Sequence, residues 1–193
     1  MRLIIRYPIS DVALMLGFFP RTSVSAIIEH MFVLGIDPGL TRTGYGIIEF
    51  RGAMERAVVA GVIRTDPDLA DAERLVELRR DVKAIVAEHE IDNAAIEQVF
   101  VNRNRHTAIA VARASGVIIE VIAESGLTVA EYTPSQMKMA VTGSGSADKQ
   151  QLRAVVAMRL GISGVEGPAD VADALGVALC HAQHHAISVV EAT

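Results

Sequence analysis

The chain has 193 residues, with 23 acidic and 18 basic side chains, a net charge of −5, and 51% hydrophobic residues. This suits one globular domain with its own core, and no apolar run reaches the roughly 18 residues that a membrane-spanning helix needs. The negative charge argues against nonspecific affinity for nucleic acids, so such a partner has to meet a local basic surface or metal-screened carboxylates. The single cysteine, Cys180, excludes an intrachain disulfide and favours a cytoplasmic location.

The first 30 residues differ in character from the rest. An apolar block at residues 12–19 is followed by small residues, which faintly resembles a secretory signal, but Asp11 beside the block weakens that interpretation. A second methionine, Met31, opens the sequence MFVLGIDPG. We therefore expect that the start is mis-assigned and that the true chain begins at Met31. We prefer this interpretation to an appended segment, and an appended segment to a signal peptide. Residues 31–193 are then expected to form a single domain.

Three strands are predicted at the front of this domain. The apolar residues 32–34 predict a buried strand that ends at Asp37. The turn Pro38-Gly39 leads to a second strand, and residues 54–64 read as a third, which together predict an antiparallel meander. Gly44 and Gly46 lie on one face of the second strand, where they let another backbone or a phosphate come close. Asp37 either caps its own turn or shares a cation with other carboxylates.

Helices and strands alternate after the meander. We expect a short strand over residues 94–97, which ends in Glu97, and another strand over residues 127–132. A capping box with Pro134 predicts the start of a helix. Further helices are expected over residues 69–90, 107–125, 147–160 and 169–188. This order predicts an α/β fold with a mixed five-stranded sheet, three antiparallel strands and then parallel ones, flanked by helices on both faces. Such a sheet brings Asp37 near Glu97.

The helix over residues 107–125 is apolar around much of its circumference. Its apolar positions include Val111, Val117, Ile118, Val121 and Ile122. One face of the core needs fewer apolar positions than this, so the helix is expected to be buried on two sides. We expect the core to cover one side and a partner chain to cover the other.

Two further carboxylates open the last predicted helix. Asp170 and Asp173 are three residues apart and project from one helical face. The helix dipole explains one acid in a first turn better than two. Together with Asp37 and Glu97 they make four like charges, which repel strongly unless divalent cations neutralise them. An all-oxygen set suits Mg²⁺ or Mn²⁺, and two such ions about 4 Å apart support in-line attack on a phosphodiester.

Four motifs carry a resemblance to a known family. In order, GIDPGLTRTGYG, AAIEQVF, GSGSADK and PADVADALGVALCH resemble RuvC-type Holliday junction resolvases (crossover junction endodeoxyribonucleases), over about residues 31–190. The resemblance implies an RNase H-like fold, a homodimer, and Mg²⁺-dependent paired nicking of four-way DNA junctions in homologous recombination and DNA repair. It also implies a branch-migration motor as partner and no membrane association. It places the catalytic, metal-binding acids at Asp37, Glu97, Asp170 and Asp173, with two Mg²⁺ ions per site, for which Mn²⁺ can substitute.

The same resemblance suggests residues that contact DNA. It places a base-wedging aromatic at Phe100, a position that the sequence pattern alone assigns to the core. Arg103 and Arg105 are candidates for phosphate contacts or belong to a solvated loop. Lys138 and Lys149 match lysines beside the substrate path, and Lys149 can stabilise negative charge in the transition state. Residues 98–153 carry six basic and four acidic side chains, a local balance of +2.

Several alternatives remain beside the junction nuclease. An RNase H-like nuclease acting on RNA fits the same acids, whereas a non-catalytic junction-binding scaffold gains nothing from anions that face phosphate. An actin-like ATPase needs a far longer chain. The spacing of His181, His184 and His185 can bind zinc, but we favour cations at a helix C-terminus.

Overall fold

A computed structural model describes residues 4–7, 30–52, 54–99, 105–165 and 167–191. Strands and helices alternate after an opening run of strands. In chain order the elements are β1 (Ile4–Tyr7), β2 (Met31–Asp37), β3 (Arg42–Arg51), β4 (Met54–Arg64), α1 (Asp71–Glu88), β5 (Asn93–Glu97), α2 (Arg105–Glu124), β6 (Thr128–Tyr132), α3 (Pro134–Thr142), α4 (Lys149–Arg159) and α5 (Ala169–Glu191).

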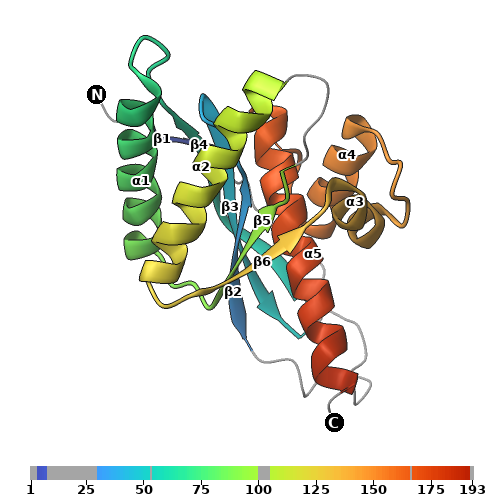
Figure 1. Cartoon of the computed structure of the whole chain (residues 1–193). Helices are drawn as coiled ribbons and strands as arrows, with labels where there is room; N and C mark the ends of the chain where they lie inside the picture. The colour runs from blue at the N-terminus through green and yellow to red at the C-terminus, as the bar shows by residue number, and fades with distance from the viewer. Residues whose placement is uncertain (1–3, 8–29, 53, 100–104, 166, 192–193) are drawn as a thin grey trace.

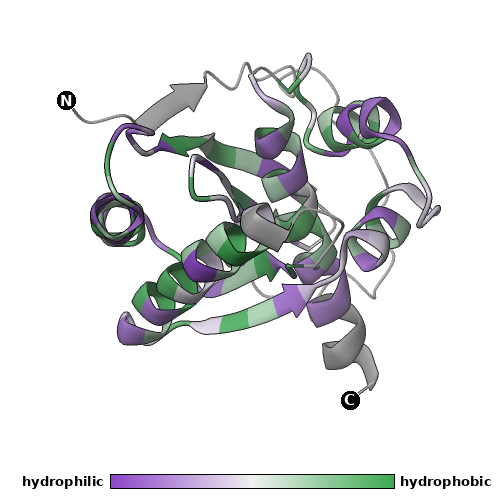
Figure 2. Cartoon of the chain, turned by 45° about the horizontal axis from the view of Figure 1, so that its top comes forward, coloured by the Kyte–Doolittle hydropathy of each residue, from purple (hydrophilic) through white to green (hydrophobic). Residues whose placement is uncertain are grey.

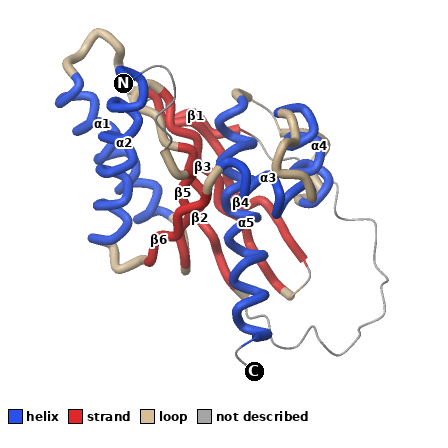
Figure 3. Tube along the Cα trace, turned by 45° about the vertical axis from the view of Figure 1, so that its right-hand side comes forward, coloured by secondary structure: helices blue, strands red, loops and turns tan. Residues whose placement is uncertain are grey.

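The strands form one sheet in the order β1-β4-β3-β2-β5-β6. Strands β2, β3 and β4 pair antiparallel, whereas β5 runs parallel to both β2 and β6. Helices α1 and α2 lie on one face of the sheet, and α5 lies on the other, with α3 and α4 beside it (Figures 1 and 3). The predicted mixed sheet, with three antiparallel strands followed by parallel ones and helices on both faces, is confirmed.

Each face of the sheet has its own hydrophobic core. Alternation along β3 assigns its residues to the two sides, so that Ile48 packs with α5 and Ile47 packs with α1 and α2. The apolar colouring in Figure 2 is concentrated on the strands and on the helix sides that face them. None of the described helices is long and apolar enough to cross a membrane.

The sixth strand, β1, comes from the segment that precedes Met31. It pairs antiparallel with β4 at the edge of the sheet, with Ile4 opposite Ile63 and Tyr7 opposite Ala60. The five predicted strands are therefore joined by one more, because β4 offers an open edge whose backbone groups can pair with any extended segment. A start at Met31 stays a prediction.

Removing residues 1–30 is expected to change the melting temperature by less than about 3 °C and to leave activity unchanged. The reason is that β1 has only four residues at an edge, whereas Met31, the first residue of β2, lies in the buried core and is kept. Amides at residues 60–63 should exchange hydrogen faster, which mass spectrometry can detect. A large fall in melting temperature would show that the segment contributes to the core.

Candidate active site

Glycines on β2 and β3 let the start of α5 lie directly on the sheet. A β-carbon at Gly44 would collide with the carbonyl oxygen of Asp170, and one at Gly35 would collide with the carbonyl oxygen of Ala174. The close approach that was predicted at Gly44 is therefore made by a backbone, that of α5. This contact fixes Asp170 beside the end of β2, where Asp37 pairs with Gly44 in the sheet register.

The turn after Asp37 is closed by other residues. The Thr43 hydroxyl donates to the Gly39 carbonyl oxygen at 2.6 Å, and the Gly39 N–H donates to the same hydroxyl at 3.3 Å. Buried Thr65 donates from its hydroxyl to the Leu40 carbonyl oxygen at 2.6 Å, which ties the turn to the end of β4. Among the described residues nothing accepts or donates a hydrogen bond to the Asp37 side chain, so the interpretation of Asp37 as a turn cap is wrong.

The four acids gather at one end of the sheet. Asp37 ends β2, Glu97 ends β5, and Asp170 and Asp173 lie in the first turns of α5. Strands β2 and β5 are parallel neighbours, so their carboxyl ends meet at the same edge. The predicted proximity of the four side chains is confirmed by the charge interactions among them.

Burial and repulsion from neighbouring acids disfavour the charged forms of Asp37, Glu97 and Asp173. Burial raises the pKa of Asp37 to about 8, and the charges of Glu97, Asp173 and Asp170 add to the rise. Burial also raises the pKa of Glu97 to about 7, with Asp173 contributing next. The pKa of Asp173 is raised by burial, although Lys149 opposes the rise. The cluster therefore resists full ionisation unless cations balance it.

Two cations of the chain already contact the cluster. Lys149 begins α4, and its Nζ lies 3.6 Å from Asp173 Oδ2. Arg42 begins β3, and its Nε lies 3.2 Å from Asp170 Oδ2. Lys138 of α3 also acts electrostatically on Glu97 and Asp173. The sequence pattern indicated both lysines but not Arg42, although Arg42 lies inside GIDPGLTRTGYG, two residues before Gly44.

The donor set has the chemistry that a divalent cation requires. All four side chains offer carboxylate oxygens, and Asp170 Oδ2 is buried without a hydrogen-bond partner in the described chain. Among the described residues no three potential ligands yet converge as a metal site would have them. The four acids nevertheless suit a divalent cation, because they offer oxygen ligands and their negative charges need to be balanced.

The metal-free protein is expected to lose stability as the pH rises. Asp37 and Glu97 hold a proton more tightly in the folded state than in the unfolded state, where their pKa values are ordinary. The folded state therefore binds more protons between about pH 4 and pH 8, and its stability falls with rising pH across that window. In EDTA, Asp37→Asn should raise the melting temperature relative to wild type, with a larger gain near pH 8 than near pH 5. A gain that is the same at both pH values would contradict this electrostatic account.

The structure describes only some of the residues that were predicted to contact DNA. Phe100 and Arg103 lie outside the described residues. Arg105 begins α2, but its side chain is likewise outside the description. Lys149 is 71% exposed and Lys138 is half-buried. The two lysines therefore interact with the acids, and the DNA contacts of Phe100, Arg103 and Arg105 stay predictions.

The histidines of α5 form a separate cluster. The helix continues through residues 186–191 to Glu191, so the prediction that His181, His184 and His185 stand at its C-terminus is wrong. His181 Nδ1 lies 3.0 Å from the Tyr132 hydroxyl, and burial, followed by the neighbouring His185 and His184, lowers the pKa of His181 to about 4. In the described part of the chain the three histidines do not form a group that could hold a metal ion, so the zinc alternative gains no support.

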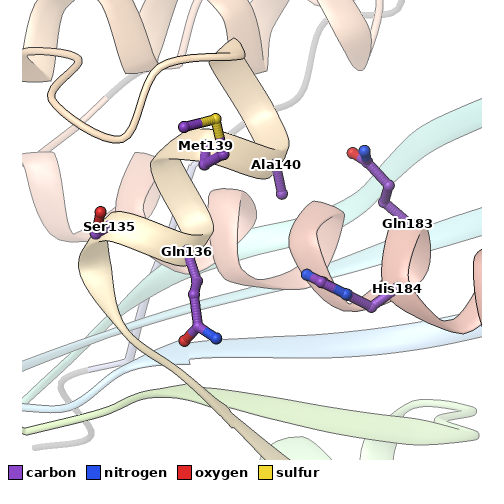
Figure 4. A pocket seen from close by; sticks show the side chains of 6 residues that line it. All are labelled: Ser135, Gln136, Met139, Ala140, Gln183 and His184. Carbon is purple, nitrogen blue, oxygen red and sulfur yellow. The ribbon is translucent and has the colours of Figure 1, made fainter.

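An open pocket of about 420 Å³ lies between α3 and α5. Its lining consists of Ser135, Gln136, Met139, Ala140, Gln183 and His184 (Figure 4). None of the four acids lines this pocket, and its walls are mostly apolar. The candidate active site is therefore the acid cluster at the end of the sheet.

Comparison with known proteins assigns the chain to a family. Residues 33–181 match the family model described as crossover junction endodeoxyribonuclease RuvC. Proteins of that name from Pelotomaculum thermopropionicum and Salinispora arenicola are 45% and 49% identical to the chain; the alignments cover 80% and 78% of this chain and 94% and 87% of theirs. The structure of T. thermophilus RuvC in complex with Holliday junction substrate superposes with a TM-score of 0.78 at 32% identity, covering 83% of this chain and 98% of that one. The five strands and flanking helices that follow Met31 thus form an RNase H-like fold, and the chain belongs to the RuvC family of crossover junction endodeoxyribonucleases.

Proposed function

We propose that this protein resolves four-way (Holliday) DNA junctions by paired, symmetric nicks during homologous recombination and DNA repair. The observation that carries the proposal is the acid cluster, in which Asp37, Glu97, Asp170 and Asp173 meet at one end of the sheet. Burial raises the pKa values of Asp37, Glu97 and Asp173. Family membership supplies the substrate, because the relatives are named for cleaving crossover junctions. We place the reaction in the cytoplasm, in keeping with the single, buried cysteine.

The reaction is hydrolysis of a phosphodiester bond. The four carboxylates would hold two Mg²⁺ ions, or Mn²⁺ in their place, which supply an activated water and neutralise charge at the phosphate. A water oxygen bonds to phosphorus, the bond from phosphorus to the 3′ oxygen breaks, and a carboxylate of the cluster accepts the proton of the water. The 3′ oxygen leaves as an oxyanion and takes a proton from solvent, so the products are a 5′ phosphate and a 3′ hydroxyl.

The lysines at the cleft complement the charge that develops on the phosphate. Lys149 has a mostly exposed ammonium group beside Asp173, so it can reach an oxygen of a bound phosphate without leaving the cluster. Lys138 adds positive charge on the α3 side. Phe100, Arg103 and Arg105 follow β5 directly in the sequence, and we assign them to the DNA path, with Phe100 wedging between bases.

Symmetric cuts in two strands require two active sites related by a two-fold axis. One chain carries one acid cluster, so the functional unit is a C2 homodimer. A branch-migration motor is the further partner that the family suggests. The outer face of α2, which points away from the sheet, is the surface that we assign to the dimer.

Cleavage assays on three matched substrates test this function. A four-way junction, a linear duplex with the same arm sequence, and an RNA–DNA hybrid are incubated with the full chain and Mg²⁺. We expect paired nicks in the junction and little cleavage of the other two. Preferential cleavage of the hybrid would favour the RNA nuclease, and binding to the junction without cleavage would favour the scaffold.

A further inference from the structure

Arg42 occupies a position at the acid cluster that the proposed chemistry does not use. It lies two residues before Gly44 on β3, so both residues face α5, and Asp170 rests against that face. Its guanidinium Nε is 3.2 Å from Asp170 Oδ2. The Arg42 side chain is 49% exposed and that of Asp170 is 19% exposed, so the pair lies at the mouth of the cluster.

The contact between Arg42 and Asp170 is electrostatic without being a well-formed hydrogen bond. Asp170 Oδ2 is buried, and its hydrogen-bonding capacity is unmet within the described residues even though the guanidinium is close. A buried carboxylate oxygen in this state gains charge balance but little orientation from its partner. Such an oxygen can give up its contact with the guanidinium and become a ligand of a divalent cation, which requires a defined coordination geometry.

We propose that Arg42 is the resident counter-cation of Asp170: it balances this carboxylate before a divalent cation arrives and weakens the binding of that cation. The inference rests on the proposed function, because it takes the acid cluster to be the metal site. Arg42 acts through Asp170 and is a positioning residue. Its positive charge repels an incoming cation, and its contact with Oδ2 has to be given up when that oxygen becomes a ligand.

A neighbouring arginine provides a matched control. Arg64 on β4 pairs directly with Arg42 in the sheet register, and cross-strand partners share a face. In the described part of the chain Arg64 is half-buried and has no ion pair with an acid. Replacing either arginine removes one positive charge and the same repulsion between the two side chains. A difference in Mn²⁺ affinity or in melting temperature between the Arg42 and Arg64 variants therefore measures the effect of the contact with Asp170.

Calorimetric titration of Mn²⁺ into the full chain, without DNA, tests the proposal. Arg42→Gln should bind Mn²⁺ about three- to tenfold more tightly than wild type, the range expected for a half-exposed charge pair. Arg64→Gln should stay within about twofold of wild type, and so should Arg42→Lys, which keeps the charge. Equal affinities for Arg42→Gln and Arg64→Gln would overturn the proposal. If wild type itself binds no Mn²⁺, the metal site of the proposed function fails first and the inference fails with it.

A double-mutant cycle in EDTA gives a readout that involves neither metal nor activity. Arg42→Gln should lower the melting temperature more than Arg64→Gln does, because only Arg42 offsets the repulsion at Asp170. In an Asp170→Asn background the two arginine substitutions should have equal effects. An excess loss for Arg42→Gln that persists without the Asp170 charge would show that Arg42 acts through another contact and would overturn the proposal.

Discussion

Asp37→Asn and Glu97→Gln are each expected to lower the rate of junction cleavage on the order of a thousandfold or more. Both substitutions keep the size of the side chain but remove a negatively charged ligand from the cluster. Junction binding should be largely kept, because affinity for DNA comes from basic side chains that contact phosphates. Single-turnover cleavage and gel-shift assays on the same junction measure the two properties separately.

An acid outside the cluster provides the control for these variants. Asp68 is exposed in the loop before α1, so Asp68→Asn removes the same charge from a residue outside the cluster. It should cleave at the wild-type rate. Wild-type cleavage by Asp37→Asn or Glu97→Gln would rule out the assignment of the cluster as the active site, whereas joint loss of binding and cleavage would point to misfolding.

Charge on the outer face of α2 is expected to produce monomers. Ile118, one of the apolar positions from which a second buried side was expected, is itself fully buried in the core between α2 and the sheet, so it does not belong to the outer face. The face that points away from the sheet carries Ile109, which is 52% exposed, with Ala112 and Gly116 at helical spacing. A β-carbon at Gly116 would meet nothing within 4 Å, so a larger residue fits the fold there. Ile109→Asp or Gly116→Glu should raise the dimer dissociation constant about 30-fold or more.

Such monomers should bind junctions weakly and lose paired cleavage although their four acids are intact. Val76 on the neighbouring helix α1 is 68% exposed, so Val76→Asp places the same charge on a face that we do not assign to the dimer. Analytical ultracentrifugation should find dimers for wild type and Val76→Asp and monomers for the two α2 variants. A wild-type monomer at micromolar concentration that still makes paired cuts would contradict the assembly.

The elements of the fold could be predicted because their signals are local. The strand over residues 54–64 and the Thr133 cap of α3 have the predicted bounds, and the Thr133 hydroxyl accepts from the Gln136 N–H at 3.1 Å. Periodicity and capping depend on neighbours in the chain, so one sequence reveals them. Strand β1 was not predicted, because it pairs with the edge of β4, which is distant in the sequence. The residues around β1 contain no local pattern that indicates this partner.

The acids of the site were predictable for a related reason. Asp37 and Glu97 each end a strand, so strand order brings these two together, and Asp170 and Asp173 share a helix face because they are three residues apart. Arg42 could not be predicted as their partner, since its contact depends on how closely α5 approaches β3 at Gly44. The outward face of α2 likewise depends on the rotation of that helix against the sheet, which sequence periodicity leaves open when both sides are apolar.

Mixed dimers test most directly the claim that each subunit's acid cluster cuts one strand of a junction. Dimers with one wild-type subunit and one Asp37→Asn subunit, separated by different affinity tags, are given a junction whose four strands carry distinct end labels. We expect a single nick per junction and no paired nick in the opposed strand. Paired nicks from these mixed dimers, at the rate of the wild-type dimer, would contradict the account.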